Sequence, residues 1–390
     1  MKHHFSTTTL FLLVLLFASG CSKGAEDLEK ERESNSVMVK IDIRNGSKTR
    51  AVTSPTAMND KELIFEDGYI FFTAQAGTIT KHLRIIKDSE TPGADEVNIG
   101  SLTTGYEIEG VPSNSTNAYM IGNIPAGVTV PTSGNISEVS ALIIHVGTQN
   151  NASGTTKVSI YGSGKITDPD SPSIDKKKAD IHVAVIAGRI EIGKFTALST
   201  GNIDSYEIDA VYTNYYYPEI RLNGSADPAT FINNENSMDN YPVGSAIGTP
   251  YEGLGLHDWH DTPLASVSKV VQPANGKVWA YNLLAPTIKL VNDDKFARPR
   301  IIVRLNNIKL TADATAGETY PDPMYLTMRL KDTETGYEIT SFDPGNIYQI
   351  DEVIFNESNL YEKPEDALLD VAVTVTLVDW TIVSSGVILN

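Results

Sequence analysis

The sequence predicts an all-β protein made of antiparallel β-sandwiches, with at most a few short helices in its loops. Three observations carry this prediction. Apolar residues recur mainly with a period of two, which is typical of half-buried strands. Turn-forming clusters separate these runs, and the 390 residues include 29 Gly and 19 Pro. No helical segments alternate regularly with the strands, which argues against a parallel α/β sheet.

The clearest strand lies near the N-terminus and ends at Asn45-Gly46, a turn signal. Four of its residues are apolar and alternate with less apolar neighbours: Val37, Val39, Ile41 and Ile43. A similar alternation near the C-terminus comprises Val371, Val373, Val375 and Leu377. Weaker strand patterns occupy residues 63–72, 157–161, 182–192, 206–212, 300–305, 325–330 and 348–355, and a short helix is expected near residues 137–145.

The chain is long enough for two sandwiches, since domains average roughly 100–200 residues. Residues 223–250 hold five Asn, three Gly and three Pro with little periodicity, and strand patterns resume only near Val278. A loop of that length is uncommon inside a compact domain. We therefore predict one sandwich over residues 51–225 and a second over residues 226–390.

The N-terminus carries an export signal. Lys2 precedes an apolar run at residues 10–18, which is too short to span a bilayer and fits the core of a signal peptide. Small residues follow and end on Cys21, the single cysteine of the chain. This segment resembles a bacterial lipobox, in which the chain is cut before the cysteine and the cysteine is acylated, although Ala18 replaces the usual leucine. An ordinary secretory signal with a chance cysteine is the alternative.

Residues 1–20 are therefore expected to be removed. Residues 22–36 are charged and poor in apolar residues, which predicts a solvated tether behind the lipid. Residues 21–50 as a whole are interpreted as a lipidated propeptide that includes the first strand.

Composition excludes several classes of partner and site. The formal net charge of −18 argues against binding to nucleic acid or to an anionic membrane surface. A lone cysteine excludes a disulfide framework and any site built from several cysteines. Contact with a membrane is expected only through the lipid.

The sequence holds no catalytic motif. A nucleophile elbow, a zinc-protease helix, a phosphate-binding loop and a dinucleotide fingerprint are all absent. We assign no catalytic residue and no cofactor, and we predict that the protein is not an enzyme.

Two clusters leave a binding role open. The segment 257–261 contains His257 and His260 with flanking aspartates and could hold a divalent ion, but a polar loop anchored by Trp259 is favoured, so no metal site is predicted. The run Tyr215-Tyr216-Tyr217, with Tyr212, could stack on a sugar. A strand end that packs its rings on both faces explains the tyrosines equally well.

The first strand is followed by a basic stretch that contains Arg50 and Ala51. A basic residue in an exposed segment of small and polar residues suits a trypsin-like protease, and a chance arginine in a surface loop is the alternative. If the bond after Arg50 is cut, the strand 37–43 leaves together with the lipid. The sandwich would then present an apolar groove and unpaired backbone groups, which can accept a strand from another chain.

The C-terminal end could supply such a strand. Residues 371–378 and 380–389 form two strand-like runs, and the second run includes Trp380, Val387 and Leu389. One molecule would then offer both halves of a head-to-tail contact, which builds a filament. An ordinary last strand that pairs within its own domain is the alternative.

These features together resemble the Bacteroidetes fimbrillins. The resemblance rests on the lipobox, the acidic segment, the first strand, the Arg50–Ala51 junction and the ending LDVAVTVTLVDW at residues 369–380. Residues 346–350 and the stretch AVIAGRI at 184–190 are also similar to family segments, although Gly188 interrupts an Ala-Arg pair.

The resemblance implies two transthyretin-like antiparallel β-sandwich domains and export to the outer membrane as a lipoprotein acylated at Cys21. It further implies trimming after Arg50 by an outer-surface protease, followed by polymerisation through strand exchange. Carried over to this chain, residues 381–390 match the donor strand. Anchor subunits of the family stay lipidated and untrimmed.

We therefore predict a stalk or tip subunit of a cell-surface fimbria. Its partners would be other fimbrial subunits, a processing protease and a receptor on a host or bacterial surface. An anchor subunit or a non-polymerising surface lipoprotein that binds glycan is the alternative, and a hydrolase ranks last.

Overall fold

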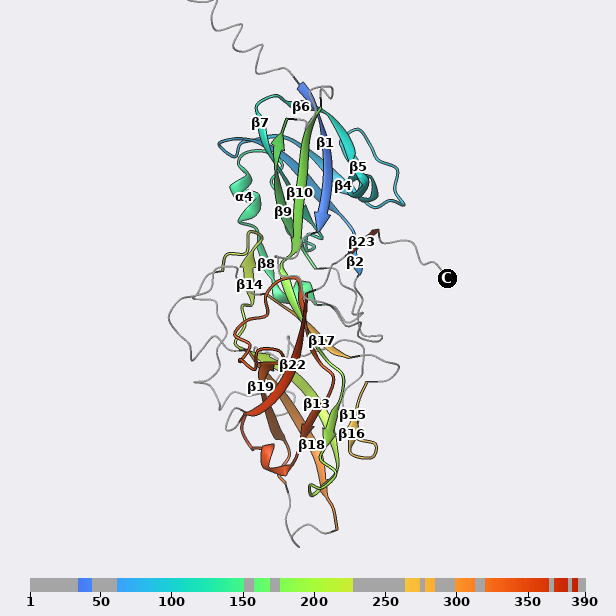
Figure 1. Ribbon diagram of the computed structural model, residues 1–390, viewed down its shortest axis with the longest axis vertical. Helices are drawn as coiled ribbons and strands as arrows, with labels where there is room; N and C mark the ends of the chain where they lie inside the picture. Colours follow the sequence, from blue (N-terminus) through green and yellow to red (C-terminus); the bar gives the residue numbers. More distant parts are fainter. Residues whose placement is uncertain are drawn as a thin grey trace, which may run out of the picture.

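A computed structural model describes residues 34–43, 62–150, 158–168, 176–226, 264–273, 278–284, 299–312, 320–364, 368–377 and 381–384. Two eight-stranded sheets lie one above the other along the long axis of the molecule (Figure 1). Helices are few and short, so the predicted all-β fold class with two β-sandwiches is confirmed. Among the helices in these ranges, none is both long enough and apolar enough to cross a membrane.

The first sheet contains the strand nearest the N-terminus. Its strands, in spatial order, are β5 (Glu96–Asn98), β4 (Ile79–Ile86), β3 (Gly68–Ala74), β7 (Ser115–Gly122), β9 (Ile160–Thr167), β10 (Lys177–Val185), β1 (Ser34–Ile43) and β6 (Tyr106–Pro112). The sheet curls so that β4, the second strand from one edge, approaches β6 at the other edge. Lys81 Nζ on β4 donates a hydrogen bond of 2.7 Å to the backbone oxygen of Glu109 on β6.

The second sheet contains the C-terminal strands. Its strands, in spatial order, are β15 (Leu264–Ala265), β13 (Ile203–Asn214), β18 (Arg300–Leu310), β19 (Met324–Asp332), β22 (Leu369–Leu377), β20 (Asn346–Ile350), β11 (Ala187–Ile192) and β17 (Trp279–Leu284). Its core includes Trp279, Tyr206 and Tyr281, three of the largest fully buried side chains.

Smaller elements complete the described part of the chain. They are the sheet of β16 (Val270–Val271), β12 (Phe195–Ala197) and β21 (Val353–Phe355), the pair β14 (Glu219–Arg221) and β8 (Ile143–His145), and the pair β2 (Glu62–Phe65) and β23 (Thr381–Ser384). The helices are α3 (Ile99–Thr104), α4 (Ile136–Ser140), η1 (Val146–Gln149) and η6 (Glu357–Asn359). Helix α4 lies where a short helix is expected, and the side chain of Asn135 caps it by accepting a 3.0 Å hydrogen bond from the Ser137 amide.

The sheets are mixed rather than purely antiparallel. Most neighbouring strands are antiparallel, but β1–β10, β4–β5, β11–β20, β12–β21, β19–β22 and β2–β23 are parallel. Alternation in the sequence shows which face of a strand is buried and carries no information about the direction of its neighbours. The parallel pairs were therefore outside what the pattern could predict.

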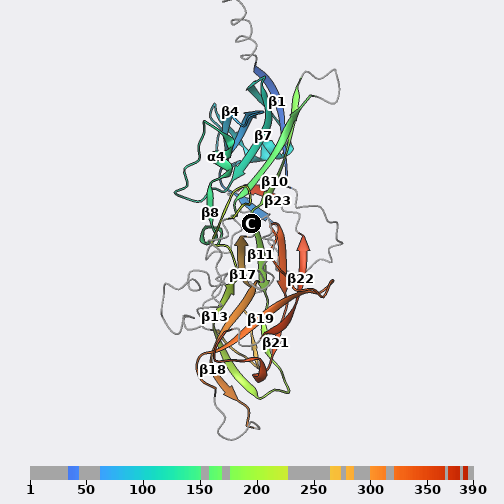
Figure 2. The same ribbon diagram turned by 90° about the vertical axis from the view of Figure 1, so that its left-hand side faces the viewer.

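The chain changes sheets at Ile186. Strand β10 of the first sheet ends at Val185, and β11 of the second begins at Ala187, so one strand follows the other almost directly (Figures 1 and 2). The predicted division between residues 225 and 226 lies within the sequence span of the second sheet, because β11 and β13 both precede it. Residues 182–192 show one continuous strand pattern in the sequence, so nothing in that pattern indicated that the chain passes there from one sheet to the other.

A buried network of amide side chains joins the two sheets. Asn282 on β17 donates from Nδ2 to the backbone oxygen of Gln149, at 2.8 Å. The side chain of Gln149 accepts a 2.7 Å hydrogen bond from the Ser159 amide, and Ser159 Oγ donates to the backbone oxygen of Asn123. These groups are paired although they are buried, so they tie the sheets together without the penalty of unsatisfied polar atoms.

Candidate strand-exchange site

Strand β1 is an internal strand of the first sheet, although it begins only 33 residues from the N-terminus. On one side it runs parallel to β10, with Val37 opposite Lys177 and Ile43 opposite Val183. On the other side it runs antiparallel to β6, with Val37 opposite Ile108. Both backbone edges of β1 are therefore hydrogen-bonded to strands that follow it much later in the sequence (Figure 1).

The inner face of β1 fills a hydrophobic slot. Val37, Val39 and Ile41 are 1%, 0% and 4% exposed and belong to the continuous core of the protein. The neighbouring side chains on the walls of the slot are apolar as well: Ile108 and Val111 on β6, and Ala179, Ile181 and Val183 on β10. Ile43 pairs through its backbone, and its side chain lies outside the described residues.

Polar contacts hold the rim of the slot. The carboxylate of Glu107 on β6 accepts hydrogen bonds from Lys176, just before β10, and from Ser36 on β1. These hydrogen bonds, that of Lys176 first, lower the pKa of the Glu107 carboxyl. The contacts are solvent-exposed and contribute little to stability, but they link the two walls to the strand between them.

Loss of β1 would separate β6 from β10. Strand β6 has no other strand neighbour in its sheet, because it is the last in the order. The two walls would expose apolar side chains and two rows of unpaired backbone donors and acceptors. Such an edge is a template for an incoming strand.

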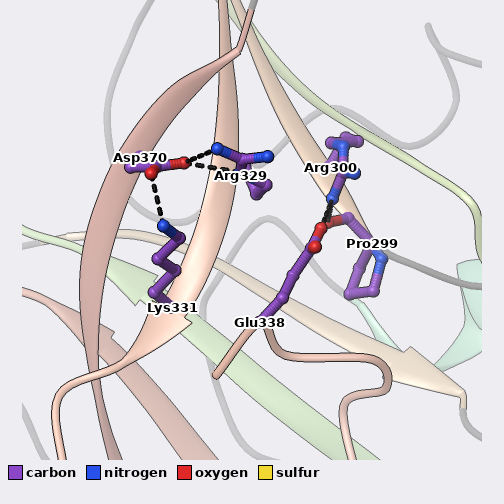
Figure 3. A network of polar contacts seen from close by, with 6 residues as sticks. All are labelled: Pro299, Arg300, Arg329, Lys331, Glu338 and Asp370. Carbon is purple, nitrogen blue, oxygen red and sulfur yellow. Dashed lines mark hydrogen bonds and ion pairs between the residues drawn. The ribbon is translucent and has the colours of Figure 1, made fainter. Parts of the chain in front are cut away.

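The first C-terminal run is held within its own sheet. Strand β22 lies between β19 and β20, and Val371 and Val373 are 5% and 0% exposed, whereas Val375 is half-buried. An ion-pair network also fixes its start, where Asp370 contacts both Arg329 and Lys331 of β19 (Figure 3). The same figure shows the neighbouring ion pair of Arg300 and Glu338, in which Nη1 and Oε1 are 2.6 Å apart. Residues 369–377 therefore form an ordinary strand that pairs within its own sheet, which is the alternative to a donated strand.

The second C-terminal run is held far less extensively. Among the residues that the structure describes, β23 pairs with β2 alone, in a parallel ladder of four residues from Glu62 opposite Thr381 to Phe65 opposite Ser384. A two-stranded ladder of this length is marginal by itself. The side chains of β23 lie outside the described residues, as do Trp380, Val387 and Leu389.

Several predicted features fall outside the described residues. They are the signal peptide, Cys21, the junction of Arg50 and Ala51, and the loop that contains His257 and His260. The junction belongs to residues 44–61, between the end of β1 and the start of β2. Within the described ranges, no group of three or more His, Cys, Asp or Glu residues is arranged so that it could hold a metal ion.

The tyrosine run does not form an exposed platform. Tyr215, Tyr216 and Tyr217 are 7%, 4% and 6% exposed. Burial raises the pKa of the Tyr217 hydroxyl, as expected for a ring in the protein interior. The run is therefore a packed strand end, and the idea that these rings stack on a sugar is wrong.

Helix α3 was missed by the sequence reasoning. It lies against β1 and places Ile99 and Leu102 in the core. The helix has six residues, and a segment this short carries no measurable periodicity, so no signal in the sequence could have found it. Strand β2 falls largely within the strand pattern expected at residues 63–72, which the structure divides into β2 and β3. The pairing of β2 with the start of the C-terminal tail was not predicted, because it depends on tertiary contacts.

Comparison with known proteins supports the fold. No protein-family model matches the chain, and no curated protein matches its sequence. The chain is similar to a fimbrilin from Porphyromonas gingivalis W83, with a TM-score of 0.51 and 14% identity over 90% of this chain and 99% of that one. It is also similar to a candidate cell adhesion protein from Bacteroides eggerthii, with a TM-score of 0.50 and 13% identity over 90% and 98% of the two chains. The fimbrillin-like fold that the sequence resemblance implied is thereby confirmed.

Proposed function

We propose that this chain is a structural subunit of a cell-surface fimbria that assembles by strand exchange. The observation that carries the proposal is the position of β1. A strand that precedes a candidate cleavage junction fills an internal hydrophobic slot between β6 and β10. The fold shared with a fimbrilin and with a candidate cell adhesion protein supports a fimbrial or adhesive role at the cell surface.

In this proposal the chain is exported, acylated at Cys21 and anchored in the outer membrane. A protease then cuts between Arg50 and Ala51. The lipid and β1 leave together, because both precede the cut. The subunit is freed from the membrane and gains an open slot in one step.

A tail from a neighbouring subunit then fills the slot. Strand β1 has ten residues, and residues 381–390 supply a run of the same length that is free of charged residues. Burying a Val or Ile side chain is worth roughly 1.5–3 kcal/mol, so an empty slot that had held Val37, Val39 and Ile41 loses several kcal/mol that a new strand can restore. Exchange therefore follows from the hydrophobic effect and from backbone pairing.

The proposed partners are other fimbrial subunits, a processing protease and a surface receptor. A stalk or tip position requires trimming, whereas an anchor subunit would remain lipidated. Catalysis has no part in this function. Both proteins compared above are named for fimbriae or cell adhesion, and neither is named as an enzyme.

The test compares chains that differ in whether the junction at Arg50 can be cut and in whether the C-terminal tail is present. A chain that starts at Ser22 is digested briefly with trypsin, and its products are followed by intact mass and by light scattering after size exclusion. We expect a stable product that starts at Ala51 and then forms oligomers. The triple variant Arg44→Ala, Lys48→Ala and Arg50→Ala, which has no basic residue at positions 44–50, should resist this cut and stay monomeric. A chain that ends at Ser384 should be cut but stay monomeric. A full-length cut product that remains monomeric would contradict the proposal.

A further inference from the structure

Helix α3 touches both strands that the proposed exchange would move. It packs mainly on β1 and also contacts β5, β6 and β23. Its buried residues Ile99 and Leu102 are 1% and 0% exposed. The helix therefore lies between the strand that trimming would remove and the strand that begins the donated tail.

The end of α3 abuts the outer face of β1. Gly105 follows the helix with φ of 103°, and a Cβ at this position would lie 3.8 Å from Met38 Sδ. Met38 points away from Val37 and Val39, because neighbouring residues of a strand face opposite sides. Met38 thus lies beside Gly105, the residue that ends α3, on the face of β1 opposite the slot.

Strand β23 has few neighbours in the described part of the chain. There it pairs with β2 alone, just below the C-terminal end of β1 (Figure 1). The partner β2 is anchored in the first half of the molecule by Phe65, which is fully buried and lies close to Gly122. Four parallel backbone pairs offset little of the entropy of ordering this segment, so the proximity of α3 to the backbone of β23 matters for its retention.

We propose that β1, acting through α3, holds β23 against β2, so that loss of β1 releases the C-terminal strand. This inference rests on the proposed function, because the released strand is the one that would enter a neighbour. An untrimmed subunit then withholds both the slot and the tail. A single cut activates both ends of the molecule.

Hydrogen–deuterium exchange tests the coupling directly. The chain that starts at Ser22 is compared with one that starts at Ala51, at a dilution where both are monomeric. We expect peptides that cover residues 381–384 to exchange about tenfold faster in the shorter chain, which corresponds to a loss of about 1.4 kcal/mol of local protection. Addition of a synthetic peptide with the sequence of residues 34–43 should restore the slow exchange. Equal exchange in the two chains would overturn the inference.

A pair of substitutions in the longer chain tests the route through α3. Met38→Ala removes the side chain that lies beside Gly105 and leaves the inward-facing residues of β1 in place, so we expect faster exchange at residues 381–384. Lys40→Ala changes the next outward and exposed position of the same strand and should leave that exchange unchanged. Identical behaviour of the two variants would exclude coupling through α3.

Light scattering on the same samples separates this inference from the proposed function. If the Ala51 chain assembles while exchange at residues 381–384 in its monomer is unaltered, the coupling is wrong and strand exchange stands. If exchange rises but no assembly follows, the coupling stands and the fimbrial proposal fails.

Discussion

Val39 of β1 and Ala179 of β10 lie directly opposite each other in a parallel pair, and both are 0% exposed. Two segments 140 residues apart in the sequence thus share one hydrophobic layer. The pairing makes the first strand an integral part of the sandwich in the untrimmed chain. If β1 were lost, the apolar side chains on β6 and β10 would be exposed unless another strand took its place.

Substitution of an inward-facing residue of β1 should destabilise the untrimmed protein. Ile41→Ala removes buried methyl groups and leaves a cavity, at an expected cost of about 2–5 kcal/mol. Lys40→Ala is the matched control on the exposed face and should change the free energy of unfolding by less than about 0.5 kcal/mol. Urea denaturation measures both. Equal effects of the two variants would mean that β1 does not contribute to the core.

The close approach of β9 and β10 should forbid a side chain at Gly162. A Cβ at this position would lie 2.0 Å from the backbone oxygen of His182, so Gly162→Ala must push the two strands apart. We expect a loss of about 1–3 kcal/mol in the free energy of unfolding. Gly147→Ala is the control, since a Cβ there meets nothing within 4 Å. A Gly162→Ala protein as stable as this control would contradict the close approach of β9 and β10 at this position.

The amide network between the sheets should make the two halves unfold together. Asn282→Ala removes the hydrogen bond to the backbone oxygen of Gln149 and leaves that buried oxygen without this donor. We expect a cost of about 1–3 kcal/mol and a broader thermal transition in calorimetry. Asn117→Ala is the control, because its side chain donates an exposed hydrogen bond to the neighbouring Thr116 rather than a buried one between the sheets. Unchanged sharpness and midpoint in Asn282→Ala would contradict this role.

The ion pairs around Asp370 should add a small, pH-dependent stability. Hydrogen bonds from Arg329 and Lys331 lower the pKa of the Asp370 carboxyl. Because the folded value is lowered, the stabilisation is fully present above the pKa of an unfolded aspartate, about 3.9, and is lost as the pH falls through the lower folded value. Asp370→Asn should cost about 1 kcal/mol or less at pH 7, since these partners are exposed.

The difference between Asp370→Asn and the unchanged protein should shrink to nothing in acid. Chemical denaturation at pH 7 and near pH 2 measures it. A difference that is the same at both values would exclude the ionised carboxylate as its cause.

The sequence allowed much of the fold to be predicted because burial leaves a periodic trace. The alternation of Val37, Val39 and Ile41 predicted a strand with one buried face, and all three of these side chains are buried. The pattern could not show that β1 lies parallel to β10, because direction depends on contacts 140 residues away. It also could not separate the proposed donor tail from β22, since Val371 and Val373 alternate in the same way but are paired within their own sheet.

The boundary between the two sheets was concealed for a related reason. Residues 182–192 read as one strand, and only tertiary pairing divides them at Ile186 into β10 and β11. Tyr215 to Tyr217 were ambiguous because aromatic rings serve packing and ligand stacking equally well. Burial resolved that ambiguity, and burial is not a property of the local sequence.

Peptide complementation tests the central claim most directly. In this account, a chain that starts at Ala51 and ends at Ser384 has an open slot and lacks residues 385–390 of the donor tail, and synthetic peptides can be offered to it. We expect a peptide with the sequence of residues 381–390 to bind, to raise the unfolding temperature, and to compete with a peptide of residues 34–43, whereas a scrambled peptide should do none of these. Binding of the 34–43 peptide without any binding of the 381–390 peptide would contradict the account.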